Sequence, residues 1–412
     1  MTWPTLKTYI APTTRSLLQH LKESPAFPPT SVNLFALSAQ AYYLQSAVSY
    51  LNRLPNSIGV LSTSLSQGVQ LSVASYSNSV CLPFRSTIPG VPQPEVGRIR
   101  MYRPPTKEDR ASEARLEDVL SGGTMSWNDA LSKSGSFELP PELEKIGNKS
   151  SVSSFFYLSD NAPEGLMQSL HRHFPNAGQL GLIASSTPFI TGRPFTMFKR
   201  SKIFADGAAG LALFHQGKQE YEIVFENLEA FSPILEVTQA QTNMVETLDH
   251  GNSVEALLRA LHQRGPVNKE DDIYLGVISD STSPVYRRRT RRPPFSHVFK
   301  VTAGGPTKGT LLLDATEGPR VGSKVQFVVA TKPEPPSTFP LIGQPTPTIS
   351  LNAISDSDIG TVSSGSQVKE VENVFLGTSE NGFVVGSSTA MATHQPWLCT
   401  IPGAKYQVQW QK

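Results

Sequence analysis

The segment from residue 202 to residue 261 constrains the fold of this chain most, because it joins strand patterns to a strong helix-start signal. An apolar run at residues 207–214, bounded by polar residues, has the length and flanks of a buried strand. At residues 219–225 apolar and polar residues alternate, which predicts a second strand that pairs with the first as a hairpin. A further extended segment is expected at residues 234–248.

A helix is expected after a turn at residues 249–251. Asn252 can cap its start, with Glu255 three residues on in the arrangement of a capping box. Gly265 is placed to end it. The apolar residues between them fall on one helical face: Val254, Leu257, Leu258 and Leu261. The order predicted for the segment is therefore strand, strand, strand, helix.

This series of motifs resembles the FIST domain, which is named for F-box and intracellular signal transduction proteins. In the first part of the chain the resemblance is carried by a DGAxGLAL strand from Asp206, Pro233, Val237-Thr238, Asn243 and an ETLDHG turn from Glu246. Further on, EG at 317–318 and VQFVV at 325–329 resemble the core of the family's C-terminal region. The resemblance implies an α+β fold of two related β-rich halves, the FIST N-terminal and C-terminal regions, with helices packed on the sheets.

Length and composition set the expected division of the chain. A length of 412 residues exceeds one ordinary core, and 33 prolines with 30 glycines predict much loop. We expect an N-terminal extension at 1–30, a FIST N-terminal-like domain at 31–265 and a FIST C-terminal-like domain at 266–412. Composition also predicts a partly disordered insertion at 85–151 and a flexible segment at 332–367.

The first residues leave the compartment open. They lack acids until Glu23 and carry Lys7, Arg15 and Lys22, a composition typical of a mitochondrial presequence. An ordinary amphipathic helix fits the same residues, so mitochondrial and cytoplasmic locations both stand. With two cysteines, the chain is expected to be intracellular, without a disulfide framework or zinc site. A net charge of +2 and no apolar run of membrane length favour neither nucleic acid nor membrane as a partner.

Motifs for catalysis are not found in the sequence. It contains no G-x-S-x-G elbow, no H-E-x-x-H, no C-x-x-C and no P-loop, so we expect no enzyme, no catalytic residues, no cofactor and no metal site. The densest charge is the arginine-rich run at residues 287–292. It is interpreted as a solvated loop between strands, or second as a contact for an acidic partner.

A candidate ligand site begins at Thr191-Gly192-Arg193. Gly192 permits close backbone approach, and Arg193 could form a fork on a carboxylate. If the fold brings these residues to Asp206 and Asn243, the set would suit a small carboxylate such as an amino acid. The alternative is a structural loop in which Arg193 pairs with Asp206.

The resemblance implies a function as well as a fold. It indicates a non-catalytic FIST-type binding or sensory module that recognises a small ligand or a protein partner in intracellular signalling. The alternative is a substrate-recognition adaptor related to F-box FIST proteins in ubiquitin-dependent protein degradation. No F-box is recognisable in the sequence.

Overall fold

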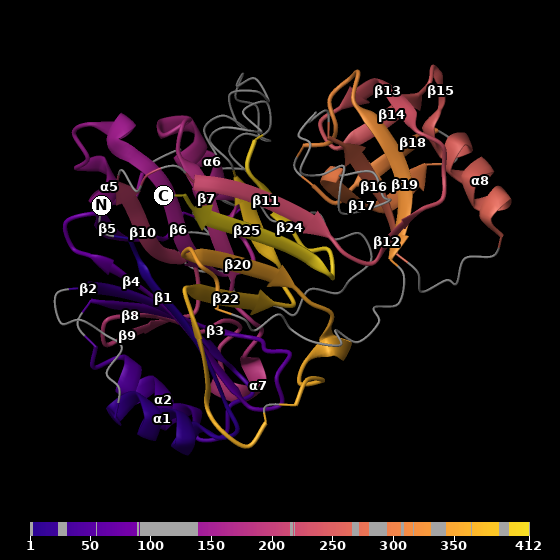
Figure 1. Ribbon diagram of the computed structural model, residues 1–412. Helices are drawn as coiled ribbons and strands as arrows, with labels where there is room; N and C mark the ends of the chain where they lie inside the picture. The colour runs from indigo at the N-terminus through magenta and orange to yellow at the C-terminus, as the bar shows by residue number, and fades with distance from the viewer. Residues whose placement is uncertain are drawn as a thin grey trace, which may run out of the picture.

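The protein is an α+β structure rich in strands, with helices packed on the sheets, so the predicted fold class is confirmed. Figure 1 shows a body built from several sheets and a small barrel beside it. The computed structural model describes residues 3–23, 31–54, 56–88, 90, 139–214, 217, 219–265, 272–279, 295–305, 309–315, 317–330, 343–363, 365–386 and 395–411.

The first sheet of the body carries the first residues of the described chain. Its seven strands are, in spatial order, β21 (Lys369–Glu372), β1 (Thr5–Ala11), β4 (Val69–Ser77), β2 (Ser31–Ser38), β3 (Ser57–Ser62), β8 (Met197–Lys199) and β9 (Lys202–Phe204). β2 and β3 are parallel, and β4 lies between β1 and β2, antiparallel to both. The outer face is covered by α1 (Thr14–Glu23) and α2 (Leu44–Leu51), whose Leu17 and Ala47 belong to one core cluster with Phe35.

The second sheet follows the same plan. Its six strands are β24 (Trp397–Cys399), β23 (Phe383–Gly386), β7 (Gly178–Ile183), β6 (Val152–Ser159), β10 (Ala208–Phe214) and β5 (Cys81–Ser86). β6 and β7 are parallel and joined through α6 (Glu164–His173), while β10 lies between β5 and β6. Leu166 and Leu170 of α6 share a core cluster with Phe155. Two short elements precede β6: α5 (Pro141–Glu144) and η1 (Lys149–Ser151).

The third sheet repeats the plan with the last residues of the chain. Its four strands are β11 (Gln219–Phe225), β25 (Ala404–Trp410), β20 (Thr348–Ala353) and β22 (Val374–Ser379). β20 and β22 are parallel, the connection between them contains η2 (Asp356–Asp358), and β25 lies between β11 and β20. Each sheet therefore has a first strand, two parallel strands and a fourth strand between the first and second. The repeat in the body is threefold, whereas the family resemblance led us to expect two related halves.

The three units exchange strands. β8 and β9 leave the second unit to extend the first sheet beyond β3, and β23 and β24 leave the third unit to extend the second sheet beyond β7. In the described chain no strand pairs with the outer edge of β22. Side chains of the first sheet bond this edge instead: Leu376 O accepts from Ser72 Oγ at 2.7 Å and Gln70 Nε2 at 3.0 Å, and Leu376 N donates to Thr8 Oγ1 at 3.1 Å. These buried polar side chains thus have a structural role.

One packing device recurs in all three units. A glycine of the third strand lies opposite a large side chain of the second strand, which covers the place where a Cβ would be. The pairs are Gly59 with Phe35, Gly181 with Tyr157, and Gly377 with Leu351. The absent side chain lets the core close over these strands.

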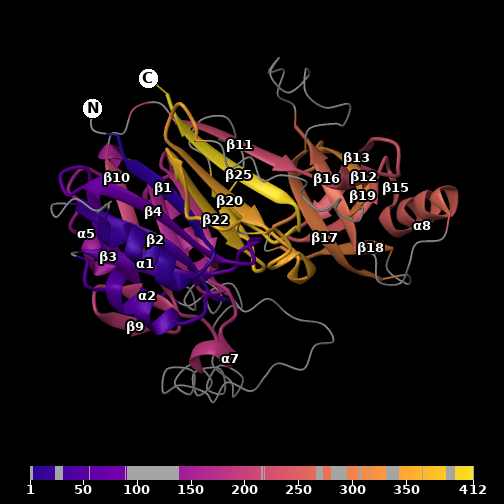
Figure 2. The same ribbon diagram turned by 60° about the horizontal axis from the view of Figure 1, so that its bottom comes forward.

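The barrel occupies the connection between β11 and β20. Its eight-stranded sheet closes because β19 pairs with both β13 and β16. Its elements are β12 (Leu228–Ala230), β13 (Leu235–Gln241), β14 (Met244–Leu248), β15 (Gly251–Asn252), α8 (Ser253–Arg264), β16 (Ile273–Ile278), β17 (Phe295–Gly305), β18 (Thr310–Leu313) and β19 (Lys324–Ala330). The domain boundary expected after residue 265 falls inside this barrel, between α8 and β16. Figure 2 shows α8 at the far side of the barrel from the body.

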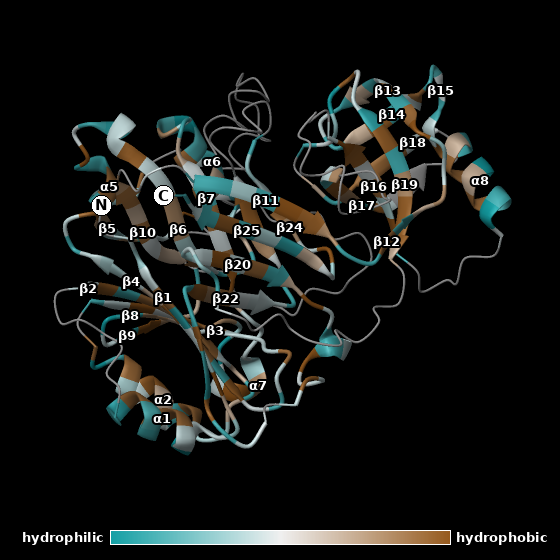
Figure 3. Ribbon diagram, viewed as in Figure 1, coloured by the Kyte–Doolittle hydropathy of each residue, from teal (hydrophilic) through white to brown (hydrophobic). Residues whose placement is uncertain are grey.

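The start of α8 confirms the predicted cap at Asn252. Asn252 Oδ1 accepts from the Glu255 backbone N–H at 3.0 Å, and Gly265 follows the helix with a φ of 98°. Leu257 is buried, as predicted, but Leu258 is 48% exposed, so its place on the buried face was wrong. Figure 3 shows α1 and α8 with both hydrophilic and hydrophobic residues, as expected for helices with one buried face.

Three other expectations differ from the structure. β10 and β11 do not form a hairpin, because β10 pairs with β5 and β6 while β11 pairs with β25. The flexible segment expected at 332–367 contains β20, whose six residues are all buried in the third sheet. The extension expected at 1–30 contains β1, which pairs with β4 and β21. Within the expected insertion at 85–151, residues 91–138 lie outside the described residues, as does the arginine-rich run.

Candidate functional site

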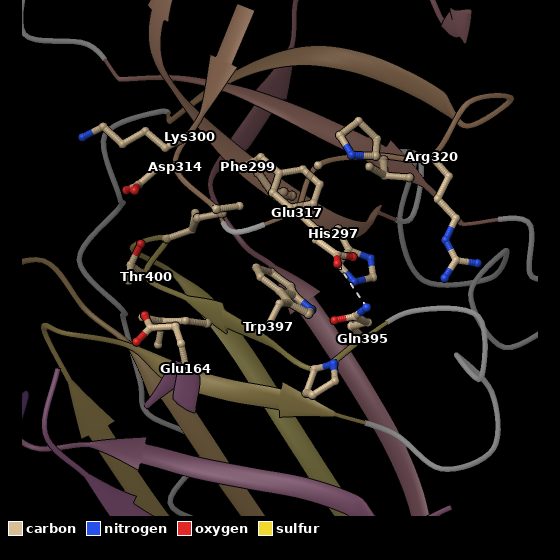
Figure 4. A pocket seen from close by; sticks show the side chains of 18 of the residues that line it. Glu164, His297, Phe299, Lys300, Asp314, Glu317, Arg320, Gln395, Trp397 and Thr400 are labelled. Atoms are coloured by element: carbon tan, nitrogen blue, oxygen red, sulfur yellow. Dashed lines mark hydrogen bonds between the residues drawn. The ribbon is translucent and has the colours of Figure 1, made fainter. Parts of the chain in front are cut away.

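A pocket lies where the barrel meets the body (Figure 4). The body contributes Glu164 and Met167 from α6 and the segment 395–401 around β24. The barrel contributes β17 and the loop at 314–323. The cavity volume is about 80 Å³, well above the roughly 10–15 Å³ that one water needs, so the pocket has room for a small molecule. Ligand sites often lie at such junctions between domains.

Glu164 is the buried acid of this pocket. It begins α6 directly after Pro163, and only 4% of its surface is exposed. Its Oε2 atom is buried and has no hydrogen-bond partner among the described residues. Burial raises the pKa of Glu164 from its ordinary 4.5 to about 7, a hydrogen bond from its own backbone N–H opposes the rise, and the charge of Asp160 adds to it. The side chain is therefore poised between its neutral and ionised forms at neutral pH.

Aromatic rings form one wall of the pocket. The Trp397 ring of β24 lies 4.9 Å from the His297 ring and 6.2 Å from the Phe299 ring, both on β17. In the view of Figure 4 the Trp397 ring lies between Glu164 and His297. Trp397 Nε1 is buried and, in the described part of the chain, has no hydrogen-bond acceptor. The wall thus offers an aromatic surface and a donor that a ligand could use.

The rim of the pocket is polar and largely paired. Lys300 Nζ lies 2.8 Å from Asp272 Oδ1, and Gln395 Nε2 donates to Glu317 Oε1 at 3.1 Å, a bond drawn in Figure 4. The second bond joins the body to the barrel across the pocket mouth. Arg320 is exposed on the barrel loop.

The residues predicted from the first motif lie elsewhere in the body. Thr191 ends the short helix α7 (Pro188–Thr191), and its hydroxyl lies within hydrogen-bond distance of Thr187 and Thr196 hydroxyls, at 3.3 and 2.7 Å. Gly192 has a φ of 73°, which a glycine adopts easily. Arg193 is exposed. This loop is held by its own threonine hydroxyls, and Figure 2 shows α7 standing off the body.

The other two predicted residues do not join that loop. Asp206 pairs with Arg85 at 3.2 Å, and the Arg85 guanidinium lies 4.5 Å from the centre of the Phe204 ring. Asn243 lies in the barrel, in the turn between β13 and β14, where its Nδ2 donates to Leu313 O at 3.0 Å. The structure therefore does not bring Thr191, Gly192 and Arg193 together with Asn243. It also pairs Asp206 with Arg85, where the alternative interpretation expected Arg193.

Sequence reasoning missed the residues of the pocket. An acidic residue after a proline at a helix start is common, because it stabilises the positive end of the helix dipole, so Glu164 carries no signal of function. Trp397 and His297 lie in strands about 100 residues apart and more than 130 residues from Glu164 along the chain. One signal was available: Trp397 directly follows Pro396, and tryptophan is enriched at interfaces because its ring is apolar while its N–H is polar.

The chain was compared with protein-family models, with curated proteins and with solved structures, and none of them matched. The resemblance to the FIST domain thus stays a prediction. In the described part of the chain, no helix is long and apolar enough to cross a membrane. Nor do the described residues contain a group of three or more His, Cys, Asp or Glu side chains that could hold a metal ion.

Proposed function

We propose that this protein is a non-catalytic binding or sensory module that takes a small ligand in the pocket between barrel and body. The observation that carries the proposal is the buried Glu164 carboxyl, whose Oε2 lacks a partner in the described structure beside an aromatic wall. A buried polar atom without a partner lowers stability, typically by about 1–3 kcal/mol. A ligand that bonds to it would recover this free energy on binding.

The two cysteine thiols are buried and protonated, which favours non-covalent binding over catalysis by a cysteine nucleophile. Cys399 adjoins the pocket residues but is fully buried, and burial raises its pKa to about 12. Cys81 is also buried, with its pKa raised to about 12 for the same reason. Both thiols are protonated at neutral pH, and the nucleophilic form of cysteine is the thiolate. The polar groups of the pocket are suited to hydrogen bonding with a ligand.

A sensory role would follow from the position of the pocket. A ligand that touches both α6 of the body and β17 of the barrel stabilises the arrangement in which these elements are close. The barrel is a separate part of the chain, inserted between β11 and β20. A ligand bound where the barrel meets the body would therefore strengthen the contact between the two parts.

A thermal-shift screen of amines, carboxylates and amino acids tests the proposal. We expect at least one compound to raise the melting temperature in a saturable way, because it binds the folded state alone. Trp397→Leu should remove this shift, measured against the variant's own melting temperature, while Arg193→Ala should keep it. The bound compound should be recovered unchanged. A shift that persists in Trp397→Leu and is lost in Arg193→Ala would place the site at the α7 loop.

Protein recognition is the second candidate, as in the adaptor alternative. Phe189 of α7 is 97% exposed, and Tyr42 and Tyr43 are 87% and 82% exposed. Large exposed apolar side chains are enriched where proteins meet. Affinity purification with the full-length protein should then recover a partner that Phe189→Ser loses. Recovery of the same proteins by both forms would count against α7 as the contact.

A further inference from the structure

Acidic groups surround the inner end of the pocket, which is the end where Glu164 lies. Asp160 precedes α6 on the body side, and Asp314 lies on the barrel side. The charges of both raise the pKa of Glu164, so both lie close enough to act on it. An anionic group placed against Glu164 would meet like charges, whereas a cationic group would meet attraction, chiefly from Glu164 and Asp314. Asp160 contributes less, because its carboxyl accepts from the Ala162 and Gly207 backbone N–H groups and lies near Arg85.

Basic residues of the lining do not offset this charge at Glu164. Lys300 is paired with Asp272 at 2.8 Å. Arg320 is exposed on the barrel loop, and Figure 4 shows it on the opposite side of Trp397 from Glu164. The inner end of the pocket therefore lacks a cation among the described residues that would form an ion pair with Glu164.

The aromatic wall of the pocket also suits a cationic ligand. Tryptophan is the side chain whose ring face attracts cations best, with useful contacts within about 6 Å of the ring centre. The Trp397 ring is held in place by its contacts with the His297, Phe299 and Phe225 rings. A carboxylate beside aromatic rings is the combination by which proteins recognise organic cations.

We propose that the pocket recognises an organic amine, whose ammonium group donates to Glu164 Oε2 while its apolar part lies against the Trp397 ring. This inference rests on the proposed function of the pocket as a ligand site. Trp397 Nε1–H is the donor for an acceptor atom elsewhere on the ligand. The ligand proposed here is thus a cation, whereas the sequence led us to expect an anionic ligand, a small carboxylate.

Two compounds with the same ring and opposite charge provide the test. Calorimetric titration of the full-length protein with phenethylamine and with 3-phenylpropionate should show at least tenfold tighter binding of the amine. Glu164→Gln should weaken amine binding about tenfold to a hundredfold, the usual range for losing a hydrogen bond to a charged group. Glu144→Gln makes the same chemical change at an exposed position of α5 and should leave the affinity unchanged.

The wild-type protein gives a second readout that needs no variant. Phenethylamine keeps its proton between pH 6 and pH 8, since aliphatic amines titrate near 10. Glu164 ionises over this range, so amine affinity should rise with pH. Among the described residues, the other charged or titratable groups near Glu164 are Tyr157, Asp160, Asp314, Glu317, His297, Lys300 and Arg320. Any pH dependence that they cause persists in Glu164→Gln, so the difference between the two proteins isolates Glu164.

Tighter binding of 3-phenylpropionate would overturn the assignment of an amine. Equal affinities of Glu164→Gln and Glu144→Gln for phenethylamine would overturn it as well, because Glu164 would then have no part in binding. In the first case the pocket would remain a ligand site, and in the second it would remain one only if Trp397→Leu abolished the binding. If neither compound binds, the amine inference fails, and the metabolite screen decides the proposed function separately.

Discussion

The body and the barrel bury their apolar residues in different ways. The largest core cluster joins residues from all three units of the body, including Leu34 of β2, Phe156 of β6 and Phe375 of β22. It also takes in five residues of the barrel strands that face the body: Leu228, Tyr274, Phe295, Val298 and Val328. A second core cluster lies inside the barrel, runs from Val237 to Phe327 along the chain and includes no residue of the three units. The body is therefore one interlocked object, and the barrel is a local insertion. The two parts share apolar contacts where they meet, and the pocket lies at the edge of these contacts, lined in part by Val298.

The sharpest test of this comparison is to separate the parts. A fragment of residues 227–331 should fold alone, because it contains the whole of the cluster inside the barrel, and it would expose only the few barrel residues that pack on the body. The first unit as a fragment of residues 3–78 should stay unfolded, because its sheet needs β8 and packs against the other sheets. Far-UV circular dichroism with thermal melting would show a cooperative transition for the first fragment alone. A cooperative transition in the 3–78 fragment would contradict the interlocked body.

Within the barrel, α8 offers a matched pair of adjacent leucines. Leu257→Ala should lower the free energy of unfolding by about 2–5 kcal/mol, since the side chain is buried in the barrel core. Leu258→Ala on the same helix should cost much less, because Leu258 is 48% exposed. Urea denaturation of the full chain measures both. Similar losses in the two variants would mean that α8 is packed differently.

At the junction, Glu164 should make stability depend on pH. Its pKa is higher in the folded state, about 7, than in the unfolded chain, so the folded state holds its proton more tightly. The wild-type contribution is therefore complete below the unfolded pKa and lost as pH rises towards 7. Glu164→Gln should match the wild type near pH 4 and exceed it above pH 7 by up to about 3 kcal/mol. Urea denaturation across pH would show this divergence, and parallel curves would argue against a buried acid.

In the body, the covered glycines should tolerate no side chain. A Cβ on Gly181 would lie 2.6 Å from the Tyr157 ring and 2.9 Å from Val384 Cβ. Gly181→Ala should therefore lower the free energy of unfolding by about 1–3 kcal/mol through overpacking. Gly147→Ala is the control, because a Cβ there would meet nothing within 4 Å. Equal melting temperatures of the two variants would show that the second sheet can relax around the added methyl group.

Local signals in the sequence predicted local structure well. The Asn252 cap and the buried strand at β10 follow from residues next to one another. The single extended segment expected at 234–248 is instead two antiparallel strands, β13 and β14, with a turn at Thr242 and Asn243. The partners of β10 and β11 did not follow, because the strands that pair with them lie far away in the sequence. β20 was not predicted because half of its residues are polar and it lies between stretches rich in proline and serine. Thr348, Ser350 and Asn352 alternate with apolar residues in a strand that is buried on both faces.

The candidate site was harder to predict for the same reason. We predicted Arg193 and Asn243 as site residues because their residue types suit a carboxylate ligand. In the structure Arg193 is exposed in the body, and Asn243 donates a hydrogen bond to Leu313 O within the barrel. Glu164 acquires its raised pKa from burial, which depends on packing and is not a property of its neighbours in the chain.

A titration of the Glu164 carboxyl shows whether this side chain is the buried acid that holds an amine. Carbon-13 NMR of the full-length protein with labelled glutamate, assigned by comparison with Glu164→Gln, would follow this carboxyl with and without phenethylamine. We expect a pKa of about 7 for Glu164 without ligand and a lower value with it, because the ammonium group stabilises the ionised carboxylate. A pKa near 4.5 without ligand, unchanged by phenethylamine, would show a hydrated carboxylate and contradict the claim.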